Sequence, residues 1–496
     1  MHYPISLYDT LQRSVRPFTP LTDNEVKIYS CGPTVYGIQH LGNMRYVFEV
    51  DLLKTVLKHI GWYDVTHVMN ITDVGHLTGD NDGDADIGED RMEKWAKRDN
   101  LSVWDVAKKY TDIFLDDIQS IDCNHFDAMP RATAYIVEQI EMVKKLVTQG
   151  LTYTIPGDGI YCDTSLIPNY GELLPSAHLQ GIKEGARIDA GDKKNPTDFA
   201  LWKFSPTTCK RAMEWIFSDD QGRTGALITD EIEKTLSDAE QATRWFPGRH
   251  IECSAMSYAL LGTQIDIHTG GIEHIPIHHT NEIVQSECSY CQRPRVKRRF
   301  HLQHLQIDGK KISKSIGNVI YVSEIYQKWF APEDVRCFFL NAHYRSFQDF
   351  TRQNLTASKN MRQNIIKKIA LHDLQHIDSH TPWAVYTTLA TAIADDLDTV
   401  QTLQHLCERV IHDTPAVYDI VLFDQRVLRL WLLEWARKLQ QASASIPDDI
   451  RVLAEQRLAA KRDKDRSQAD QLRRTIEEKG RLLKDTADGY QLEKNI

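Results

Sequence analysis

The sequence predicts an α/β fold, in which a Rossmann-like parallel-sheet domain is split by an insertion and followed by α-helical C-terminal domains. Three observations support this prediction. A buried strand, a turn, a helix and a second strand follow one another within residues 26–70. Sheet-like sequence returns near residue 250, after a segment of different texture. From about residue 322 onward the apolar spacing is mostly helical.

The first strand is predicted at residues 26–31, VKIYSC, and it runs into a Gly-Pro turn. Residues 44–59 then place apolar side chains at helical spacing, and a second strand is predicted at residues 65–70. Ligands of open α/β sheets bind beyond the carboxyl ends of the strands. We therefore expect a binding site where these two strands end, at Cys31 and at the cluster of Asn70, Thr72 and Asp73.

The segment after residue 120 combines glycine turns, short alternating runs such as GIYCDTS and a polar helix-like stretch, TDEIEKTLSDAEQATRW, so we interpret it as an insertion. Two later stretches, IECSAM and QIDIHTGG, are predicted to belong to the sheet. Near the C-terminus, a stretch rich in lysine and arginine has Leu458, Ala469, Leu472 and Ile476 at helical spacing, and Gly480 is the predicted helix stop. A chain of 496 residues is too long for one core. The predicted domains are 1–120 and 246–321 for the two halves of the sheet domain, 121–245 for the insertion, 322–445 for a helical region and 446–496 for a terminal domain.

The charge of the chain is unevenly distributed. Lysine and arginine total 59 and aspartate and glutamate total 69, which gives a formal net charge of −10. This average alone disfavours a nucleic-acid partner, because phosphate binding depends on basic surface. Residues 451–496, however, hold 12 lysines and arginines against 9 acids, which leaves a modestly basic end for RNA. The run RVKRRF predicts a second basic patch, formed by Arg295, Lys297, Arg298 and Arg299.

Composition also bears on location. Nine cysteines are too sparse for a disulfide scaffold and indicate free thiols or metal ligands. The sequence has no run of the roughly 18 apolar residues that a membrane helix needs. Its start lacks the basic and apolar regions of a secretory signal. We expect no membrane partner and a cytoplasmic location.

Two places in the sequence could hold a metal ion. His278 and Glu282 in HHTNE would share one face of a helix, and their alternative interpretation is a surface ion pair. With Cys31 and Cys253, each at the end of a predicted element, they make a zinc-type set of two thiolates, an imidazole and a carboxylate. The competing proposal is a structural zinc site at the CxxC segment, whose candidate ligands are Cys288, Cys291, His301 and His304.

Two further segments suit phosphate binding. His40-Leu41-Gly42-Asn43 falls where the first helix begins, and a helix start offers unpaired N–H groups to an anion. The segment Lys311-Ile312-Ser313-Lys314-Ser315 puts two lysines on a hydroxyl-rich loop, where they can neutralise the charge of a departing phosphate group. An N-terminal turn and a solvated surface loop are the alternative interpretations of these segments.

These residues carry a resemblance to a known family. HLGN and KISKS resemble the HIGH and KMSKS signatures of class I aminoacyl-tRNA synthetases. The motifs CGPTVYGIQHLGN, NITDVGH, NPTDFALWK, HIECSAM, DIHTGGIEH, HHTNE and HYRS occur in that order and resemble the cysteinyl-tRNA synthetase family from about residue 5 to residue 490.

The resemblance implies a role for particular residues. The implied zinc ligands are Cys31, Cys253, His278 and Glu282. The implied catalytic residues are His40, Asn43, Lys311 and Lys314. The implied ATP-binding residues are His40, Gly42, Asn43, Gly270, Gly271, Glu273 and Lys314, and the implied residues of the cysteine pocket are Thr72, His268 and Cys31.

The resemblance also implies an activity. ATP, accompanied by magnesium, would activate L-cysteine to cysteinyl-adenylate, and the cysteinyl group would move to the 3′-terminal adenosine of cysteine tRNA. One zinc ion per subunit would bind the substrate as a thiolate and so select it against serine. Residues 121–245 would be a connective peptide, residues 322–445 a stem-contact and helical-bundle region and residues 446–496 an anticodon-binding domain. The family also implies a monomer.

The sequence departs from the family pattern at four positions, which are Asn43, Arg249, Glu273 and Ile312, and the stretch from Trp202 to Cys253 is longer than expected. Four protein ligands would also fill a zinc site that needs an open position. We hypothesise that the site expands to five ligands or that Glu282 loosens.

Two rival functions remain at the sequence level. One is a ligase that attaches cysteine to an amino sugar, which shares both signatures but lacks the full tRNA-binding end. The other is a silent paralogue that acts as an RNA-binding or regulatory protein. The stretch KDRSQADQLRRTIEEKG near the C-terminus argues for tRNA, and the presence of all four implied ligands and both lysines argues against a silent copy.

Overall fold

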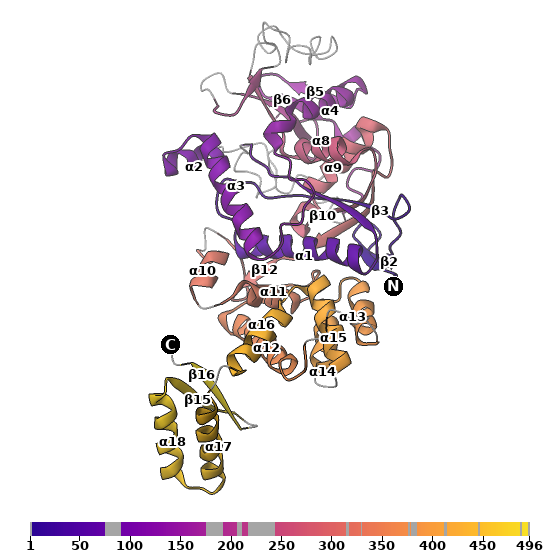
Figure 1. Cartoon of the computed structure of the whole chain (residues 1–496). Helices are drawn as coiled ribbons and strands as arrows, with labels where there is room; N and C mark the ends of the chain where they lie inside the picture. The colour runs from indigo at the N-terminus through magenta and orange to yellow at the C-terminus, as the bar shows by residue number, and fades with distance from the viewer. Residues whose placement is uncertain are drawn as a thin grey trace. The chain divides into compact units, whose positions relative to one another are not determined.

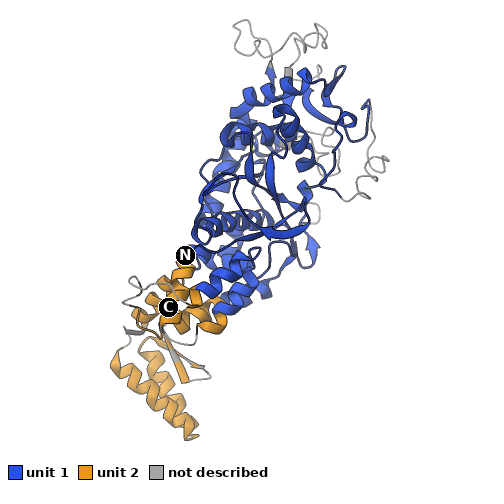
Figure 2. Cartoon of the chain, turned by 90° about the vertical axis from the view of Figure 1, so that its right-hand side faces the viewer, with its two compact units in different colours: residues 1–359, 387–406, 426–430 blue, residues 360–386, 407–425, 431–496 orange. Residues whose placement is uncertain are grey.

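The computed structural model describes residues 2–74, 91–174, 192–205, 211–216, 244–313, 317–328, 330–374, 377, 384–410, 414–444, 447–486 and 489–494 (Figure 1). The chain divides into two compact units (Figure 2). Unit 1 comprises residues 1–359, 387–406 and 426–430, and unit 2 comprises residues 360–386, 407–425 and 431–496. Within the described ranges, no helix combines the length and the apolar character needed to cross a bilayer. The five predicted domain boundaries stay predictions.

The centre of unit 1 is a parallel sheet of four strands in the order β11-β10-β3-β4. The strands are β3 (Glu25–Ser30), β4 (Asp64–Met69), β10 (Ile265–Gly271) and β11 (Val296–Leu302). Helix α1 (Leu41–His59) connects β3 to β4, and helix α9 (His278–Tyr290) connects β10 to β11. The two connections leave β3 and β10 in opposite directions across the sheet, so the strand order reverses between these two neighbours. The predicted Rossmann-like α/β fold is confirmed, and its topological switch point lies between β3 and β10.

Both predicted strands and the first helix lie where the sequence puts them, within a few residues. One stretch was predicted wrongly: IECSAM belongs to helix α8 (Arg249–Leu261), which follows strand β9 (Arg244–Pro247) and begins after Gly248. A short apolar run does not reveal its period, and only Ile251 in this stretch is β-branched. The helix buries Ile251 and Ala255, which are four residues apart on one face.

The insertion contains a second sheet. Its five antiparallel strands run in the order β5-β6-β7-β9-β8. They are β5 (Thr152–Ile155), β6 (Gly159–Cys162), β7 (Phe199–Phe204), β8 (Trp215–Ile216) and β9. Helix α4 (Ile136–Thr148) packs against α8 and α9, so the insertion shares a hydrophobic core with the helices around the parallel sheet. Most of the polar helix-like stretch at residues 229–245 lies outside the described residues.

Two helices precede the insertion core, α2 (Arg91–Asp99) and α3 (Val103–Ser120). Smaller elements complete unit 1. The hairpin of β1 (Ser6–Asp9) and β2 (Ser14–Pro17) lies at the start of the chain, and a three-stranded sheet has the order β13-β12-β14. These strands are β12 (Leu305–Ile307), β13 (Lys310–Lys311) and β14 (Gln348–Phe350), and the nearby helices are α10 (Val322–Gln327) and α11 (Pro332–Leu340).

The basic run RVKRRF does not form the predicted surface patch. Most of it forms β11, an edge strand of the parallel sheet in which Arg298 and Arg299 are buried, and Arg295, just before the strand, is buried as well. Arg295 donates to the carbonyl of Gly262, and Arg298 donates to the carbonyl of Pro17. The guanidinium groups donate hydrogen bonds to buried backbone oxygens. The cluster of basic residues in the sequence therefore wrongly predicted that these arginines are exposed.

The C-terminal half of the chain is mainly helical, as predicted. Its helices are α12 (Arg352–Ile369), α13 (Ala384–Ala394), α14 (Thr399–Arg409), α15 (Thr414–Phe423), α16 (Leu432–Ala444), α17 (Asp448–Arg462) and α18 (Arg466–Glu478). Gly480 follows α18 with φ +78°, which confirms the predicted stop. The hairpin of β15 (Arg481–Thr486) and β16 (Gly489–Lys494) was not predicted. It packs with α17 and α18 around the small core of Ile450, Ala454, Ile476 and Leu483.

Candidate active site at the topological switch point

The candidate site lies at the carboxyl ends of β3, β10 and β4. Cys31 follows the last residue of β3, and Asn70 follows the last residue of β4. His268 lies in β10, opposite Tyr29 of β3 in the parallel register. The sequence predicted this edge of the sheet, and the structure places the predicted residues there.

The structure brings together the four residues that the sequence predicts as zinc ligands. The ligand atoms of Cys31, Cys253, His278 and Glu282 all lie within 4.8 Å of one another, and all four side chains are buried. Cys31 Sγ is 3.9 Å from Cys253 Sγ, and His278 Nε2 is 2.8 Å from Glu282 Oε1. His278 and Glu282 are four residues apart in α9, so the predicted shared helix face is confirmed, but as a buried pair and not as a surface ion pair.

The electrostatics of the cluster suit a divalent metal of the zinc type. A hydrogen bond from the Cys31 thiol lowers the pKa of Cys253 to about 6; burial opposes this shift, and His278 adds to it. Burial would raise the pKa of Glu282, but His268 and His278 hold it well below its usual value. Thiolate and carboxylate are the forms in which these groups bind metal. Two sulfurs, one imidazole and one carboxylate match the donors that zinc prefers.

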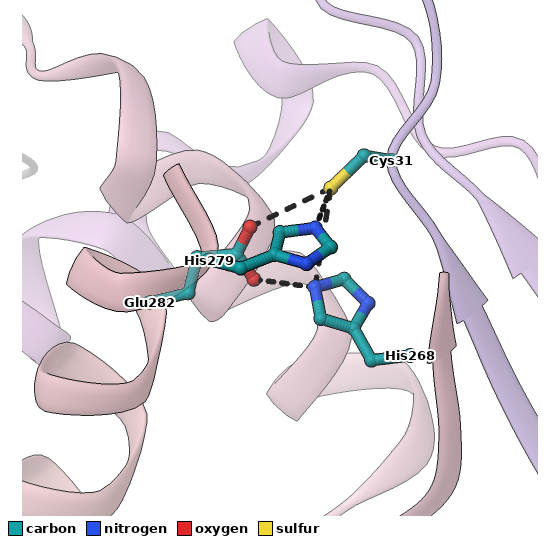
Figure 3. Close-up of side chains that lie close together, drawn as sticks. All are labelled: Cys31, His268, His279 and Glu282. Atoms are coloured by element: carbon teal, nitrogen blue, oxygen red, sulfur yellow. Dashed lines mark hydrogen bonds and ion pairs between the residues drawn. The ribbon is translucent and has the colours of Figure 1, made fainter. Parts of the chain in front are cut away.

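A second, overlapping group of ligand atoms lies beside the first. Cys31, His268, His279 and Glu282 also lie within 4.8 Å of one another (Figure 3). His279 Nε2 is 3.4 Å from Cys31 Sγ, and His268 Nε2 is 2.8 Å from Glu282 Oε2. His279 was missed as a site residue, although the doubled histidine of HHTNE was a signal for it. Glu282 therefore has histidine partners on both sides.

Further buried groups hold the ligands in place. His279 Nδ1 is 2.7 Å from His301 Nε2, and His301 Nδ1 is 2.7 Å from Thr10 Oγ1. On the other side of the cluster, His250 Nδ1 is 2.8 Å from His278 Nδ1, which leaves Nε2 of His278 facing Glu282. Second partners of this kind fix the ring orientation of metal-binding histidines.

Asn70 connects the cluster to Thr72. Its side-chain oxygen accepts from the amide of Gly32 at 2.9 Å, and its amide nitrogen donates to Thr72 Oγ1 at 3.0 Å. Cys253 Sγ is 3.7 Å from the same oxygen of Asn70. Thr72, a predicted residue of the cysteine pocket, thus lies beside the cluster, as does His268.

The HLGN segment begins α1 as predicted. His40 is the N-cap, and its Nδ1 accepts from the backbone N–H of Asn43 at 3.3 Å. The side-chain amide of Asn43 donates to the side-chain oxygen of Gln39, a buried residue whose own amide donates to the carbonyls of Thr34 and Gly37. Gln39 was missed because a glutamine before a helix has no distinctive pattern.

The two signature segments meet. A Cβ on Gly42 would lie 3.1 Å from the ring of His40 and 3.1 Å from Cδ1 of Ile312. In addition, the amide of Leu41 donates to the carbonyl of Ile320 at 2.9 Å. Lys311 ends β13 and is exposed. The predicted Lys314 lies outside the described residues.

The turn after β10 contains the remaining predicted ATP-binding residues. A Cβ on Gly270 would lie 2.6 Å from the ring of His279, so only glycine permits this close approach. A Cβ on Gly271 would lie 2.2 Å from Oε2 of Glu273. Burial raises the pKa of Glu273, but His274, His304 and Lys311 lower it below its usual value. The groups that lower the pKa of this carboxylate include a lysine of the KISKS segment.

The competing zinc proposal finds no support in the described part of the chain, where the grouped metal-ligating side chains include neither Cys288 nor Cys291. His301 is engaged with His279 and Thr10, and His304 lies 3.6 Å from Glu273. The histidines that would complete the CxxC half-site therefore contact residues of the candidate site instead.

Comparison with known proteins agrees with this geometry. Residues 17–229 and 237–360 match the family model of the tRNA synthetases class I (C) catalytic domain. Cysteine–tRNA ligase 1 of Burkholderia lata is 37% identical over 500 residues, which cover 99% of this chain and 97% of the relative. The chain belongs to the cysteine–tRNA ligase family. The cysteine–tRNA ligase of Treponema denticola is 35% identical over 97% of this chain and 98% of its own length.

As a member of the cysteine–tRNA ligase family, the chain is a ligase of the class I aminoacyl-tRNA synthetases. Its fold is also similar to solved synthetases of other specificities. Methionyl-tRNA synthetase of Mycobacterium tuberculosis, in complex with methionyl-adenylate, matches with a TM-score of 0.53 at 11% identity, over 86% of this chain and 95% of that chain. LeuRS of Agrobacterium radiobacter K84, in a ternary complex with tRNA and LeuAMS, matches with a TM-score of 0.54 at 10% identity, over 84% of this chain and 86% of that chain. At such low identity these likenesses concern the fold alone.

Proposed function

We propose that this ligase activates L-cysteine with ATP to cysteinyl-adenylate and transfers the cysteinyl group to the 3′-terminal adenosine of cysteine tRNA. The observation that carries the proposal is a juxtaposition. The HLGN and KISKS segments meet at Gly42 and Ile312, and the same sheet edge holds a buried group of two thiols, an imidazole and a carboxylate. The names of the relatives support cysteine as the amino acid.

In this proposal Cys31, Cys253, His278 and Glu282 hold one zinc ion. Bound there, zinc would take the sulfur of the substrate as a thiolate, a contact that the harder and less acidic hydroxyl of serine makes poorly, which supplies discrimination on the order of 10³-fold. Glu282 is the ligand that can loosen, because His268 offers its carboxylate a second partner at 2.8 Å. Thr72, Cys31 and His268 line the cysteine pocket.

The ATP side of the proposal rests on the start of α1 and on the turn after β10. Nδ1 of His40 accepts from Asn43, so a neutral His40 carries its proton on Nε2 and can donate to a phosphate oxygen. One N–H of the Asn43 amide is used by Gln39, and the other remains for ATP. Gly42, Gly270 and Gly271 permit close approach of the nucleotide, and Glu273 contacts its ribose.

The lysines act on the phosphates. Lys311 and Lys314 stabilise the charge that develops on pyrophosphate as the cysteine carboxylate attacks the α-phosphate. Magnesium accompanies the ATP and neutralises its phosphate oxygens. The exposed side chain of Lys311 is free to follow the phosphates, which agrees with its place at the end of a two-residue strand.

The tRNA-binding part of the proposal concerns the later domains. Residues 446–496 would bind the anticodon, residues 322–445 would contact the stem and residues 121–245 would act as the connective peptide. The exposed arginines of α17 and α18, among them Arg462, Arg466, Arg473 and Arg474, supply basic surface at the proposed anticodon end.

Cysteine-dependent ATP–pyrophosphate exchange, followed by charging of cysteine tRNA, tests this function and separates its rivals. We expect both activities. Exchange without charging would favour the ligase that acts on an amino sugar. Absence of both activities from a zinc-loaded, folded preparation would favour the silent paralogue.

A further inference from the structure

The C-terminal turn of α9 holds two thiols that the proposed reaction does not use. Cys288 lies in the last turn of the helix and is half-buried, and Cys291 is the exposed C-cap. The backbone N–H of Cys291 donates to the carbonyl of Cys288 at 3.2 Å, so both residues belong to one turn. Cys291 has φ +50°, a left-handed conformation that glycine takes most often at this position.

Both thiols line one cavity of about 200 Å³ between α9 and the loop that contains Tyr170. The lining includes the apolar side chains of Ile283 and Val284. It also includes an ion-pair group, in which Arg293 lies 2.5 Å from Glu172 and 3.8 Å from Glu287. Gln149 closes the other side of the turn: its amide donates to the carbonyl of Cys288 at 2.8 Å and lies 4.0 Å from Cys291 Sγ.

The two thiols are too few to bind zinc by themselves, and the described residues around them supply no further ligand group. Their placement suits thiol–disulfide exchange instead. Residues three apart in a helical turn have Cβ atoms about 5–6 Å apart, and a disulfide needs roughly 3.5–4.5 Å, so the turn must tighten as the bond forms. One thiol is open to solvent, and its neighbour stands behind it.

We propose that Cys288 and Cys291 form a reversible oxidation site that reacts with a small amino-acid disulfide of the cystine type. The cavity determines the size of the reagent, because about 200 Å³ is less than the roughly 300–1,000 Å³ of sites for drug-sized ligands. The lining carries both signs of charge, in the carboxylates of Glu172 and Glu287 that flank Arg293, and the ammonium and carboxylate groups of a zwitterionic disulfide can join this ion-pair group. This inference is independent of the proposed aminoacylation.

The exchange balances as follows. The Cys291 thiolate attacks one sulfur of the reagent, breaks its S–S bond and releases one molecule of cysteine. The Cys288 thiolate then attacks the Cys291 sulfur of the mixed disulfide, forms the Cys288–Cys291 bond and releases the second cysteine. Cystine is reduced to two cysteines, which take up the two thiol protons, and the protein loses two hydrogens.

The order of attack follows from the environment of each thiol. Cys291 is exposed, so it meets the reagent first. Burial raises the pKa of the Cys288 thiol, and Glu287 adds to this effect. Cys288 therefore attacks a free disulfide slowly. Once the mixed disulfide has formed on Cys291, the attack by Cys288 is intramolecular and proximity accelerates it.

The test incubates the zinc-loaded full chain with cystine, blocks the remaining thiols by alkylation and maps the peptides by mass spectrometry. We expect loss of both free thiols at 288 and 291, an internal disulfide between them, and full recovery on addition of a dithiol reductant. Cys288→Ser should accumulate a cysteinyl adduct on Cys291, and Cys291→Ser should leave Cys288 unmodified. Cys407→Ser, which removes another half-buried thiol, should react like the wild type.

A parallel incubation with glutathione disulfide examines the role of the cavity, and we expect several-fold slower oxidation with this larger reagent. Equal rates would overturn the choice of an amino-acid disulfide. Retention of both thiols in the wild-type chain, or a cysteinyl adduct that never resolves, would overturn the site itself. The wild-type peptide map decides this even if a variant fails to fold, and neither result depends on aminoacylation activity.

Discussion

At the scale of single residues, the candidate site is defined by which thiols and imidazoles share one small volume. Two groups of four ligand atoms overlap at Cys31 and Glu282. They differ in whether Cys253 and His278 or His268 and His279 complete the set. Zinc favours the set with two sulfurs, since soft thiolates bind it more strongly than additional imidazoles do.

This difference gives a direct prediction. Cys253→Ser should fold but lose bound zinc and cysteine activation together, while His279→Ala should keep about one zinc per chain because it lies outside the two-sulfur set. Metal analysis of the purified variants, with Cys407→Ser as a thiol-removal control, makes the measurement. Zinc retained in Cys253→Ser but lost in His279→Ala would assign the other set.

Gln39 gives a second residue-scale prediction. It holds the side-chain amide of Asn43, which stands where the HIGH signature has its second histidine. Gln39→Ala removes this hydrogen bond and frees the amide to rotate, so we expect kcat/KM for ATP in the exchange assay to fall about tenfold, the effect of roughly 1.4 kcal/mol. The KM for cysteine should not change. Wild-type kinetics for ATP would rule out this positioning role.

At the scale of elements, helix α1 contains a buried carboxyl group without a hydrogen-bond partner in the described structure. Glu49 is completely buried, and neither of its carboxylate oxygens has a hydrogen-bond partner among the described residues. Arg45 lies one turn earlier, and its Nε is 3.8 Å from Glu49 Oε1. The other two nitrogens of its guanidinium group donate to four backbone carbonyls, including those of Gln303 and His343. Burial raises the pKa of Glu49 to about 8, and Arg45 opposes the shift only in part.

The sign of the pH effect follows. The unfolded chain loses the Glu49 proton near pH 4.5, while the folded chain keeps it up to about pH 8. The folded state therefore binds more protons between these values, and stability falls as pH rises through this window. Glu49→Gln should remove this component, so its thermal midpoint should exceed that of the wild type more at pH 8.5 than at pH 5. Exposed Glu434→Gln is the control, and an equal difference at both pH values would contradict the prediction.

The secondary-structure elements also show which parts of the fold could be predicted from the sequence. The strands that end at Cys31 and Asn70, the helix that begins at HLGN and the helix of HHTNE were predictable, because apolar periodicity and capping residues act locally. IECSAM was not, since its apolar run fits either a strand or a helix until Gly248 and β9 fix its start. The arginines of β11 were misplaced for a related reason: sequence shows charge but not the buried carbonyls that accept from it.

In the candidate site too, local motifs could be predicted and contacts between distant parts of the chain could not. Cys31, Cys253, His278 and Glu282 could be named from motifs, but their distances could not, because they come from three separate places in the chain. His250 contributes through its contact with His278 of another helix, and no local pattern marks such a contact. Asn70 and the doubled histidine that contains His279 were visible in the sequence, but their partners in the cluster were not. The hairpin of β15 and β16 escaped prediction; among its residues whose side chains are described, Leu483 alone is buried, so burial in the core marks little of it.

At the scale of the whole molecule, the acidic net charge and the burial of the β11 arginines leave little basic surface for nonspecific phosphate binding. Recognition of tRNA should then depend on shape and on a few contacts from the proposed anticodon end. We expect the KM for tRNA to rise less steeply with salt than in a strongly basic protein.

A charge reversal in α18 tests this view. Arg466→Glu should raise the KM for tRNA several-fold and reduce its salt dependence, because one phosphate contact is replaced by repulsion. ATP–pyrophosphate exchange should be unaffected. Lys108→Glu, at an exposed position of α3 outside the proposed tRNA-binding domains, is the matched control. Unchanged charging kinetics in Arg466→Glu would remove α18 from the proposed interface.

The dispersal of the metal-ligand cluster has a consequence for biosynthesis. Cys31 leaves the ribosome early, whereas Glu282 follows about 250 residues later, roughly 10–50 s at ordinary translation rates. During that interval the strand that becomes β3 has no β10 beside it, and its terminal thiol has no sulfur or imidazole neighbours. Loading of the proposed zinc would therefore be a late event that coincides with closure of the parallel sheet, so nascent chains released before α9 is made would carry Cys31 as an unprotected thiol.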